Sequence, residues 1–421
     1  MKMVNLVEIK DIKADSSWAF DNLSRKQTNY VSHGYHKYPA KFIPQLVDKL
    51  ITNYSREGDT ILDCFGGCGT TLVESKLKQR NSIILDVNDA ALLITAAKKT
   101  AINPIILGNY NQILLNNLSK IKIKKDYYIS AHPRLKYWFK KDQYNKLMEI
   151  FLLINRIDNR NIRIFYQCCF SNILKNCSIW FSKSIKPMRD YNKPDYDPVE
   201  SFTKHLKFMT LRNEEYYNHL KKIEKVSALI QKRDARKTGL KSESIDLIIT
   251  SPPYAISYEY ADLHQLTLLW FGFAKDMNNI KKEFIGTSST SKETFFTNSE
   301  IANRIVKHLY KKDKSLSRQI GKYYSDMFFV FKEMHRVLRK NGGVCIIIGD
   351  TQYKKIKVRN VEVFIDLLNN IGFKTEKIIK RKLSSKTFTP YRDNEGKFTN
   401  ACNGEKKRVY QYEYILIAKK P

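Results

Sequence analysis

Short apolar runs alternate with amphipathic segments in the first hundred residues of the chain. Residues 60–62 form a mainly apolar run that predicts a buried strand, and residues 71–79 have the spacing of a helix. A second apolar run at residues 82–85 ends in Asp86, and residues 90–100 predict the helix after it. Strands that alternate with helices favour a doubly wound, mostly parallel α/β sheet.

The same alternation resumes after residue 225. Mainly apolar runs predict further strands at residues 226–231, 245–249, 344–348, 374–381 and 409–418. An amphipathic helix is predicted over residues 324–338, and Asn341–Gly342–Gly343 is expected to end it. Another helix is predicted after residue 260, and we interpret its apolar stripe as core; the stripe consists of Leu263, Leu266, Leu269 and Trp270.

Other segments depart from this pattern. Residues 101–225 are rich in Lys, Asn and Tyr, with helical patterns near residues 143–155 and 215–230. Residues 275–320 are rich in Lys, Ser, Thr and Asn and are predicted to form a mobile insertion. A long basic loop is expected at residues 384–407.

These departures define the expected domain organisation. Residues 33–100 and 226–421 are predicted to form one discontinuous domain. Residues 101–225 are predicted to be a mainly helical insertion within it. Residues 1–32 are polar and mixed, and we expect them to form an N-terminal arm on the surface.

The charge of the chain points to a polyanionic partner. The 421 residues include 74 Lys and Arg against 42 Asp and Glu, which gives a formal net charge of +32. Nucleic acid is the natural candidate for such a partner. Aromatic residues alternate with basic ones in the insertion, a pattern that suits phosphate contact and base stacking; they are Tyr127, Tyr128, Tyr137, Trp138, Phe139, Trp180 and Phe181. The insertion is therefore our candidate for a recognition region.

The seven cysteines do not indicate a metal site. None forms a Cys-x-x-Cys pair, and no His and Cys residues have the spacing of zinc ligands. An odd number of cysteines without a signal peptide leads us to expect a reducing cytoplasm. No apolar run approaches the length of a membrane span, so we expect no membrane association.

A glycine-rich stretch joins the first strand to its helix, in the order Asp63–Cys64–Phe65–Gly66–Gly67–Cys68–Gly69–Thr70–Thr71. In a doubly wound sheet, a turn at the carboxyl end of a strand is a usual site for a nucleotide-like ligand. Asp86 ends the next strand, 23 positions after Asp63, where a carboxylate can accept the protons of both ribose hydroxyls. Taken alone, the glycines are weak evidence, because a simple tight turn has the same composition.

A second motif, Ser251–Pro252–Pro253–Tyr254, follows the buried strand at residues 245–249. Together with the glycine-rich turn, it resembles the S-adenosylmethionine-dependent DNA methyltransferases that modify exocyclic amino groups. Its form is most typical of the cytosine-N4 enzymes, because adenine-N6 enzymes more often begin the motif with Asp or Asn. The resemblance covers roughly residues 33–100 and 226–420.

The resemblance implies a Rossmann-like, seven-stranded, mostly parallel sheet with an antiparallel last strand, and S-adenosylmethionine as the cofactor. The stretch from His33 to Pro44 looks like the family's cofactor-flanking motif, and an acidic residue at the place of Asp234 hydrogen-bonds the adenine amino group in the family. The cofactor-binding residues expected on this basis are Lys41, Phe42, Asp63, Phe65, Gly67, Gly69, Thr70, Thr71, Asp86 and Asp234. The expected catalytic residues are Ser251, Pro252, Pro253 and Tyr254.

The chemistry explains why these residue types are needed. An exocyclic amino nitrogen is a poor nucleophile because its lone pair is delocalised into the ring. The Ser251 hydroxyl and the Pro252 carbonyl can accept its hydrogen bonds and direct the lone pair at the methyl group. Tyr254 can stack on a base flipped out of double-stranded DNA. This route needs no cysteine nucleophile and we assign none, nor do we assign a proton-transfer role to His33 or His36.

The sequence departs from the family pattern in two ways. Cys64 replaces a proline common after the motif's aspartate, and the glycine-rich motif precedes Ser251–Tyr254, whereas the reverse order is common.

The alternatives to cytosine-N4 methylation are adenine-N6 methylation of DNA, methylation of RNA, and a nucleic-acid-binding subunit without turnover. A cognate restriction endonuclease is a possible partner of such an enzyme.

Overall fold

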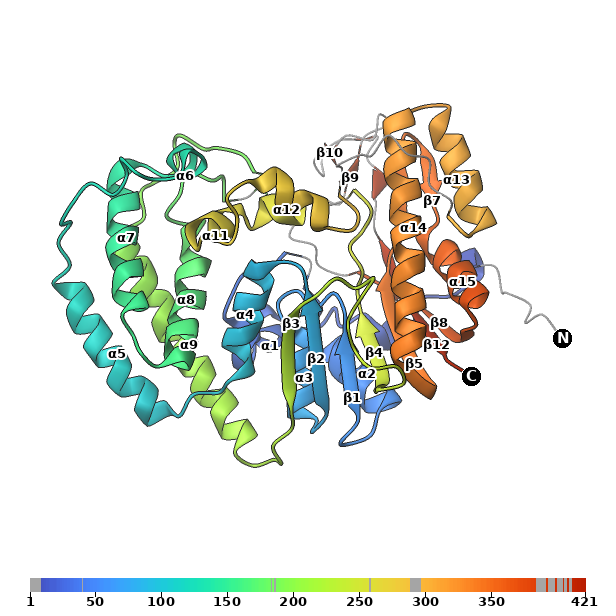
Figure 1. Cartoon of the computed structure of the whole chain (residues 1–421), viewed down its shortest axis with the longest axis horizontal. Coiled ribbons are helices and arrows are strands. Elements are labelled where there is room, and N and C mark those ends of the chain that lie inside the picture. The colour runs from blue at the N-terminus through green and yellow to red at the C-terminus, as the bar shows by residue number, and fades with distance from the viewer. Residues whose placement is uncertain are drawn as a thin grey trace.

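A central sheet organises the computed structural model of the protein (Figure 1). The structure describes residues 9–39, 41–182, 184, 187–256, 259–287, 297–383, 391–392, 398–399, 404, 407–408 and 411–421. In these residues the sheet has seven strands in the order β3-β2-β1-β4-β5-β12-β8. The strands are β1 (Thr60–Asp63), β2 (Asn81–Asp86), β3 (Ala228–Lys232), β4 (Ile245–Thr250), β5 (Leu338–Ile348), β8 (Lys374–Lys382) and β12 (Tyr412–Lys419).

Strand direction matches the expected doubly wound fold. The pairs from β3 across to β5 are parallel. Strand β12 lies between β5 and β8 and runs antiparallel to both. The predicted mostly parallel sheet with an antiparallel last strand is therefore confirmed.

Both faces of the sheet are buried, which explains the continuous apolar runs. Alternate residues of a strand point to opposite faces, so Leu247 and Ile249 of β4 pack in a cluster with helix α2 (Pro44–Tyr54). Ile248 points the other way and packs in the cluster that contains helices α14 (Lys314–Val337) and α15 (Asn360–Ile371). Helices α3 (Thr70–Leu77) and α4 (Asp89–Lys99) follow the first two strands.

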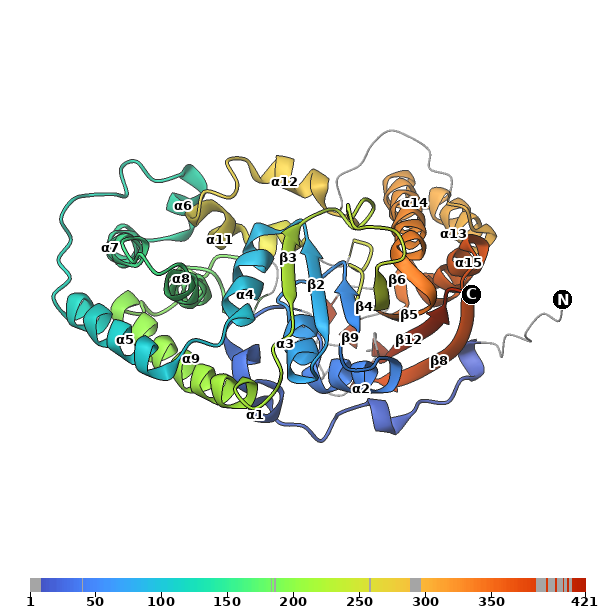
Figure 2. The same ribbon diagram turned by 60° about the horizontal axis from the view of Figure 1, so that its bottom comes forward.

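The inserted residues form a helical lobe beyond β3 (Figures 1 and 2). Its helices are α5 (Pro104–Ser119), α6 (Pro133–Trp138), α7 (Lys141–Asn155), α8 (Arg160–Leu174) and α9 (Pro198–Leu220). The helix predicted near residues 215–230 is wrong in its bounds, because the helix ends at Leu220 and β3 follows. The lobe packs in one cluster with α4 and with α11 (Gln265–Trp270), so it is joined firmly to the sheet. The domain boundaries themselves stay a prediction.

The N-terminal residues are more than a surface arm. Trp18 is 4% exposed and packs against α2 and the sheet, with Lys49 Nζ 4.2 Å from its ring centroid. The amide of Asp15 donates to the carbonyl of Lys380, the residue that also forms an isolated bridge with Ala14. Residues 11–17 and 20–30 are exposed or half-buried, as expected of a surface arm, but Trp18 and Ala19 between them are buried, and the polar composition concealed this anchor. Residues 1–8 lie outside the described residues.

The predicted mobile insertion at residues 275–320 is largely helical. Helix α12 (Met277–Glu283) and helix α13 (Glu300–Tyr310) lie within it, and α14 begins at Lys314 rather than near residue 324. Ala302, Ile305 and Leu309 bury one stripe of α13, which the polar composition around them obscured. Residues 288–296 of this segment lie outside the described residues.

Further boundaries differ from the prediction. Asn341–Gly342–Gly343 lies inside β5 and does not end α14, because the chain turns extended at Leu338 directly after the helix. Asn341 takes a positive φ of 65°, and the pairing of β4 with β5 shifts register nearby. The helix predicted after residue 260 is broken into α10 (Tyr260–Leu263) and α11. Leu266, Leu269 and Trp270 of its apolar stripe are core as expected, whereas Leu263 is half-buried.

The remaining strands are short. β6 (Thr351–Tyr353) and β7 (Ile356–Val358) form a hairpin. β9 (Tyr391–Arg392), β10 (Phe398–Thr399) and β11 (Lys407–Arg408) pair within the predicted basic loop, most of which lies outside the described residues. Within the described chain, no helix has the length and apolar character required to cross a membrane.

We expect Trp18→Ala to destabilise the fold by about 3–5 kcal/mol, the usual cost of removing a large buried aromatic side chain. The matched control is Ile113→Ala in α5, where the side chain is 61% exposed and the cost should stay below about 0.5 kcal/mol. Denaturant unfolding followed by circular dichroism measures both. Equal midpoints for the two variants would contradict the anchoring role of Trp18.

Candidate functional site

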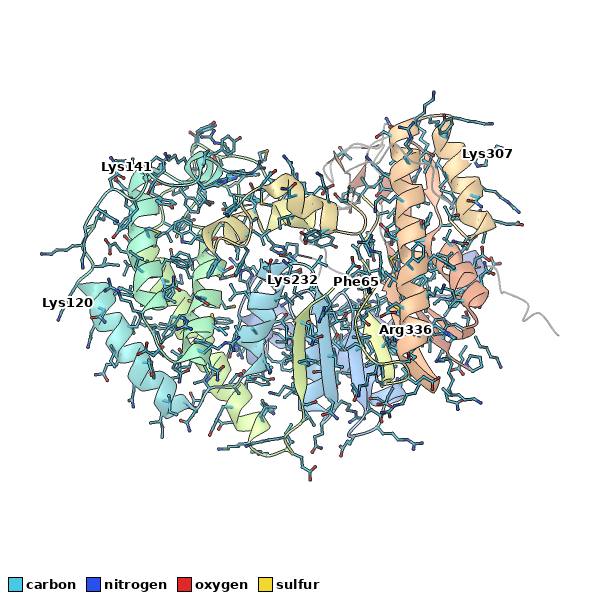
Figure 3. The ribbon with its side chains drawn as sticks, viewed as in Figure 1. Phe65, Lys120, Lys141, Lys232, Lys307 and Arg336 are labelled. Atoms are coloured by element: carbon cyan, nitrogen blue, oxygen red, sulfur yellow. The ribbon has the colours of Figure 1, made fainter. Side chains whose placement is uncertain are left out.

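A pocket opens at the carboxyl ends of β1, β2 and β4 and collects most of the predicted site residues. Figure 3 shows Phe65 and Lys232 at this edge of the sheet. The predicted residues that line the pocket are Lys41, Phe42, Asp63, Phe65, Gly67, Thr70, Asp86, Asp234, Ser251 and Pro253. Gly69, Thr71, Pro252 and Tyr254 belong to the same turns but do not line it.

The pocket also contains residues that our sequence reasoning missed. Tyr38 and Pro39 line it, and their position inside the stretch from His33 to Pro44 could have indicated this. Asn88 stands two residues after Asp86. Tyr260 and the segment 283–285 come from far along the chain, and no sequence signal marks them.

Side chains of α4 donate hydrogen bonds to the carbonyls of the glycine-rich turn and hold it in place. The Thr95 hydroxyl donates to the carbonyl of Gly67 at 2.9 Å, and the ammonium of fully buried Lys98 donates to the carbonyl of Cys68 at 2.7 Å. Gly69 has a φ of +73°, and a Cβ added there would lie 2.7 Å from Cγ2 of Thr95. Glycine is therefore required at this position by both conformation and space.

Asp63 joins the turn to two neighbouring elements. Its carboxylate accepts hydrogen bonds of 2.7 Å from the Thr71 and Thr250 hydroxyls, and one of 3.2 Å from the Phe65 amide. The residue is 1% exposed, and burial raises the pKa of its carboxyl to about 6 despite these hydrogen bonds. Asp63 and Thr71 thus hold each other and fix the shape of the turn.

Asp86 is half-buried and faces the pocket. One carboxylate oxygen accepts from the Gly67 amide and the other from the Asn88 amide, each at 2.8 Å. Burial raises the pKa of this carboxyl to about 6, and the hydrogen bonds oppose that shift. Each oxygen keeps capacity for a further hydrogen bond, because a carboxylate has about four acceptor positions.

Asp234 lies at the rim and is paired with Arg236. The guanidinium donates to both carboxylate oxygens of Asp234, with the shortest distance 2.6 Å from Nη2 to Oδ2. The same guanidinium reaches Asp326 at 2.7 Å. Burial acts to raise the pKa of Asp234, but the hydrogen bonds from Arg236 outweigh it and the pKa is lowered.

The Ser251–Tyr254 loop is bound to the neighbouring strands. The Ser251 hydroxyl donates its proton to the carbonyl of Ile347 in β5 at 3.1 Å. The Tyr254 hydroxyl donates to Glu413 in β12 at 2.8 Å, and Glu413 is in turn 3.6 Å from the buried guanidinium of Arg381. Both side chains of the motif therefore have defined orientations.

The residues of the stretch before α2 are mostly occupied in packing. His33 is fully buried with Nε2 2.6 Å from Glu74, and His36 Nε2 lies 2.9 Å from the Ser171 hydroxyl. Burial lowers the pKa of His36 to about 3. The ammonium of Lys41 donates to Asn29 and to the carbonyl of His33, while Phe42 lines the pocket beside it.

The aromatic residues predicted to stack on bases do not form one surface. Trp138, Phe139 and Trp180 are at most 2% exposed and belong to the core of the lobe. The expectation of stacking is wrong for these three, because interleaving with lysines does not reveal which helix face is buried. Tyr137, in contrast, is 50% exposed.

A family sequence pattern matches most of the chain, and the curated relatives are type II methyltransferases. The sequence pattern of the family described as DNA methylase, the N6 and N4 type, matches residues 3–97 and 245–421. Type II methyltransferase M.MvaI of Kocuria varians is 25% identical over 361 residues, 79% of each chain. Type II methyltransferase M.MjaII of Methanocaldococcus jannaschii is 39% identical over 110 residues, 26% of this chain and 20% of that one.

A solved structure is similar only at a low level. A SAM-dependent methyltransferase of Methanosarcina mazei is 9% identical and covers 91% of this chain and 98% of its own, with a TM-score of 0.32.

We expect Gly69→Ala to destabilise the protein by about 1–3 kcal/mol, because a left-handed conformation and the approach to Thr95 both oppose a Cβ. Gly108→Ala in helix α5 is the matched control. A Cβ there would meet no described atom within 4 Å, and alanine should stabilise the helix by up to about 1 kcal/mol. Thermal unfolding of both variants measures the difference, and a shift of the same sign in both would contradict the steric argument.

Proposed function

Because the chain belongs to the N6 and N4 DNA methylase family, a family of S-adenosylmethionine-dependent enzymes, we propose that it methylates the exocyclic N4 amino group of cytosine in DNA. The observation that carries the proposal is the placement of Ser251 in the wall of the pocket that also contains the glycine-rich turn. The choice of cytosine rests on the Ser-Pro-Pro-Tyr form of the motif. Adenine-N6 is the alternative that the experiment below must exclude.

The chemistry of the pocket fits S-adenosylmethionine. Asp86 presents a carboxylate that can accept the two ribose hydroxyl protons. Asp234 keeps acceptor positions beside its bonds to Arg236, and we propose that it accepts from the adenine amino group. Phe65 and Lys41 line the same pocket. When bound, the cofactor supplies a methyl group on a positively charged sulfonium.

Ser251 is oriented to act as an acceptor. Its only proton is directed at the carbonyl of Ile347, so the lone pairs of its oxygen are left for another donor. We propose that these lone pairs and the Pro252 carbonyl hold the amino group of the target base and direct its nitrogen lone pair to the methyl group. The proton that leaves the amino nitrogen after transfer goes to solvent or to a nearby acceptor.

Tyr254 is proposed to stack on the flipped base. Its hydroxyl is bound to Glu413, so the ring is positioned before any base arrives. This preorganisation reduces the ordering that base binding would otherwise require. Glu413 would thus act through Tyr254 as a positioning residue.

Double-stranded DNA is the proposed substrate, and the net charge of +32 supports many phosphate contacts. The relatives above are named type II methyltransferases, which supports a place in a restriction–modification system for this chain as well. A cognate endonuclease would then recognise the same DNA sequence.

Cofactor affinity should depend on pH through Asp86. The carboxylate must be ionised to accept two hydroxyl protons, and its pKa in the free protein is about 6. Affinity should be constant above about pH 7 and fall by up to tenfold per pH unit below pH 6. Calorimetry with S-adenosylmethionine across this range measures the effect.

Two matched variants identify the group responsible. Asp86→Asn should weaken binding at pH 8 by about 1–3 kcal/mol and flatten the acid limb of the profile. Asp63→Asn removes a carboxyl with the same pKa that is bound to Thr71 and Thr250. It should weaken binding at every pH, because the turn loses an acceptor, but it should leave the acid limb in place. If the pH profile of cofactor affinity became flat in Asp63→Asn but not in Asp86→Asn, the titrating group would be Asp63, and the assignment to Asp86 would be wrong.

The proposed reaction is tested by incubating unmodified DNA with the protein and labelled cofactor, followed by mass spectrometry of the nucleosides. We expect N4-methylcytosine. Label on the adenine amino group would overturn the choice of base but keep the mechanism, and label on cytosine carbon-5 would overturn both.

Variants of the catalytic motif test the assigned roles. Ser251→Ala should lower the turnover number without abolishing it, because the Pro252 carbonyl remains. Tyr254→Ala should lower turnover by the loss of stacking, worth about 1–3 kcal/mol, and leave cofactor affinity unchanged. Tyr254→Phe keeps the ring but loses the bond to Glu413, so its defect should be smaller. An equal defect in the last two variants would contradict the stacking role.

A further inference from the structure

A column of stacked side chains crosses the surface of the helical lobe, outside the pocket. The guanidinium carbon of Arg189 lies 4.2 Å from the ring centroid of Tyr137 and 4.4 Å from that of Tyr191. The ring of Tyr137 packs edge-on against Trp138, and Trp138 stacks on Trp180 with ring centroids 4.8 Å apart. The column is therefore buried at its Trp180 end and open at its Tyr191 end.

The column is rigidly supported. The amide of Ile179 donates to the carbonyl of Trp138, which ties the loop after α8 to helix α6. Trp180 and Arg189 form an isolated antiparallel bridge, and the amides of Phe181 and Asp190 complete it by donating to the carbonyls of Met188 and Ile179, respectively. Side chains that are already ordered lose little entropy on binding.

The open end exposes groups that a folded protein would normally cover. Tyr137 is 50% exposed, Tyr191 69% and the adjacent Met188 49%. Nε of Arg189 is shielded from solvent, yet it has no hydrogen-bond partner among the described residues. Adjacent exposed aromatic side chains with an arginine between them are typical of a binding surface.

Helix α6, which carries Tyr137, lies at the end of the molecule toward which the carboxyl ends of the parallel strands point (Figure 1). Arg134 in α6 donates to Gln265 at 2.7 Å and lies 3.9 Å from Asp262, in the segment that follows the Ser251–Tyr254 loop. Tyr260 of that segment lines the pocket. Lys141, labelled in Figure 3, begins the next helix and is 59% exposed on its side chain.

We propose that Tyr137, Arg189 and Tyr191 form a DNA contact that packs against the bases or sugars of the duplex beside the target base. DNA is favoured over a protein partner because of the charge of +32 and the DNA methylase family. The exposed ring of Tyr191 suits stacking on a nucleoside, and the planar guanidinium held between the two rings keeps that ring in place. The inference rests on the proposed function insofar as DNA is the substrate.

The experiment compares full-length variants in two assays: the binding of a fluorescent mixed-sequence duplex by anisotropy, and the KM for unmodified plasmid DNA in methyl transfer. Arg189→Ala and Tyr191→Ala should each weaken duplex binding and raise the KM for DNA by about tenfold or more. The turnover number at saturating DNA and the affinity for S-adenosylmethionine should stay unchanged. Tyr196→Ala is the matched control, because Tyr196 is 48% exposed on the same segment but lies outside the column.

Arg189→Lys separates stacking from charge. Lysine keeps the positive charge but has no planar group, so the defect should persist in this variant. Full recovery with lysine would overturn the stacking contact. If Arg189→Ala and Tyr191→Ala changed duplex affinity and the KM for DNA no more than Tyr196→Ala does, the proposed DNA contact would be wrong.

The two assays distinguish a failure of the proposed function from a failure of the proposed DNA contact. If the wild-type protein binds the duplex but transfers no methyl group, the enzymatic proposal fails, and the anisotropy series alone decides the role of the column. Circular dichroism of each variant verifies folding, and Tyr191→Ala is the variant least able to disturb it because the side chain is mostly exposed.

Discussion

The carboxylate of Asp63 is the constraint on which the site depends. It ends β1 and binds the Thr71 hydroxyl in the first turn of α3, together with the Thr250 hydroxyl at the end of β4. Ser251 follows Thr250 directly. One buried side chain therefore fixes the glycine-rich turn and the start of the proposed catalytic loop relative to each other, across two neighbouring strands.

Both side-chain oxygens at position 63 must accept hydrogen bonds, which explains why the residue is an aspartate. Three donors converge on Asp63, and an amide side chain would place an N–H group against one of them. The cost is a buried carboxylate with a pKa raised to about 6. Asp86 has a similar pKa for the same reason, burial, but it faces the pocket and gives only one acceptor position per oxygen to the backbone. Two aspartates of the same motif set thus serve different purposes: one shapes the turn, and the other is free to bind a ligand.

The sequence was most informative where backbone constraints and apolar periodicity coincide. The first two strands, the glycine-rich turn and Asp86 were all predictable, because few residue types satisfy a buried strand or a left-handed turn. Single anchors and hidden faces were not predictable. Trp18 lies in a mainly polar segment, and the buried stripe of α13 is surrounded by lysines and serines. Likewise, Trp138 and Tyr137 are neighbours in sequence, yet only packing against Trp180 shows that one is core and the other surface.

The helical lobe is built partly from the chain that the family pattern matches. That pattern omits residues 98–244, but α11 lies within its second matched segment and contributes Leu266, Leu269 and Trp270 to the core of the lobe. The ring of Trp270 contacts Phe139, Tyr144 and Phe170 of the insertion. The lobe therefore cannot move far relative to α11 without disrupting a core that the two share. Because α10 precedes α11 and its Tyr260 lines the pocket, a contact made by the lobe with DNA would act close to the proposed site.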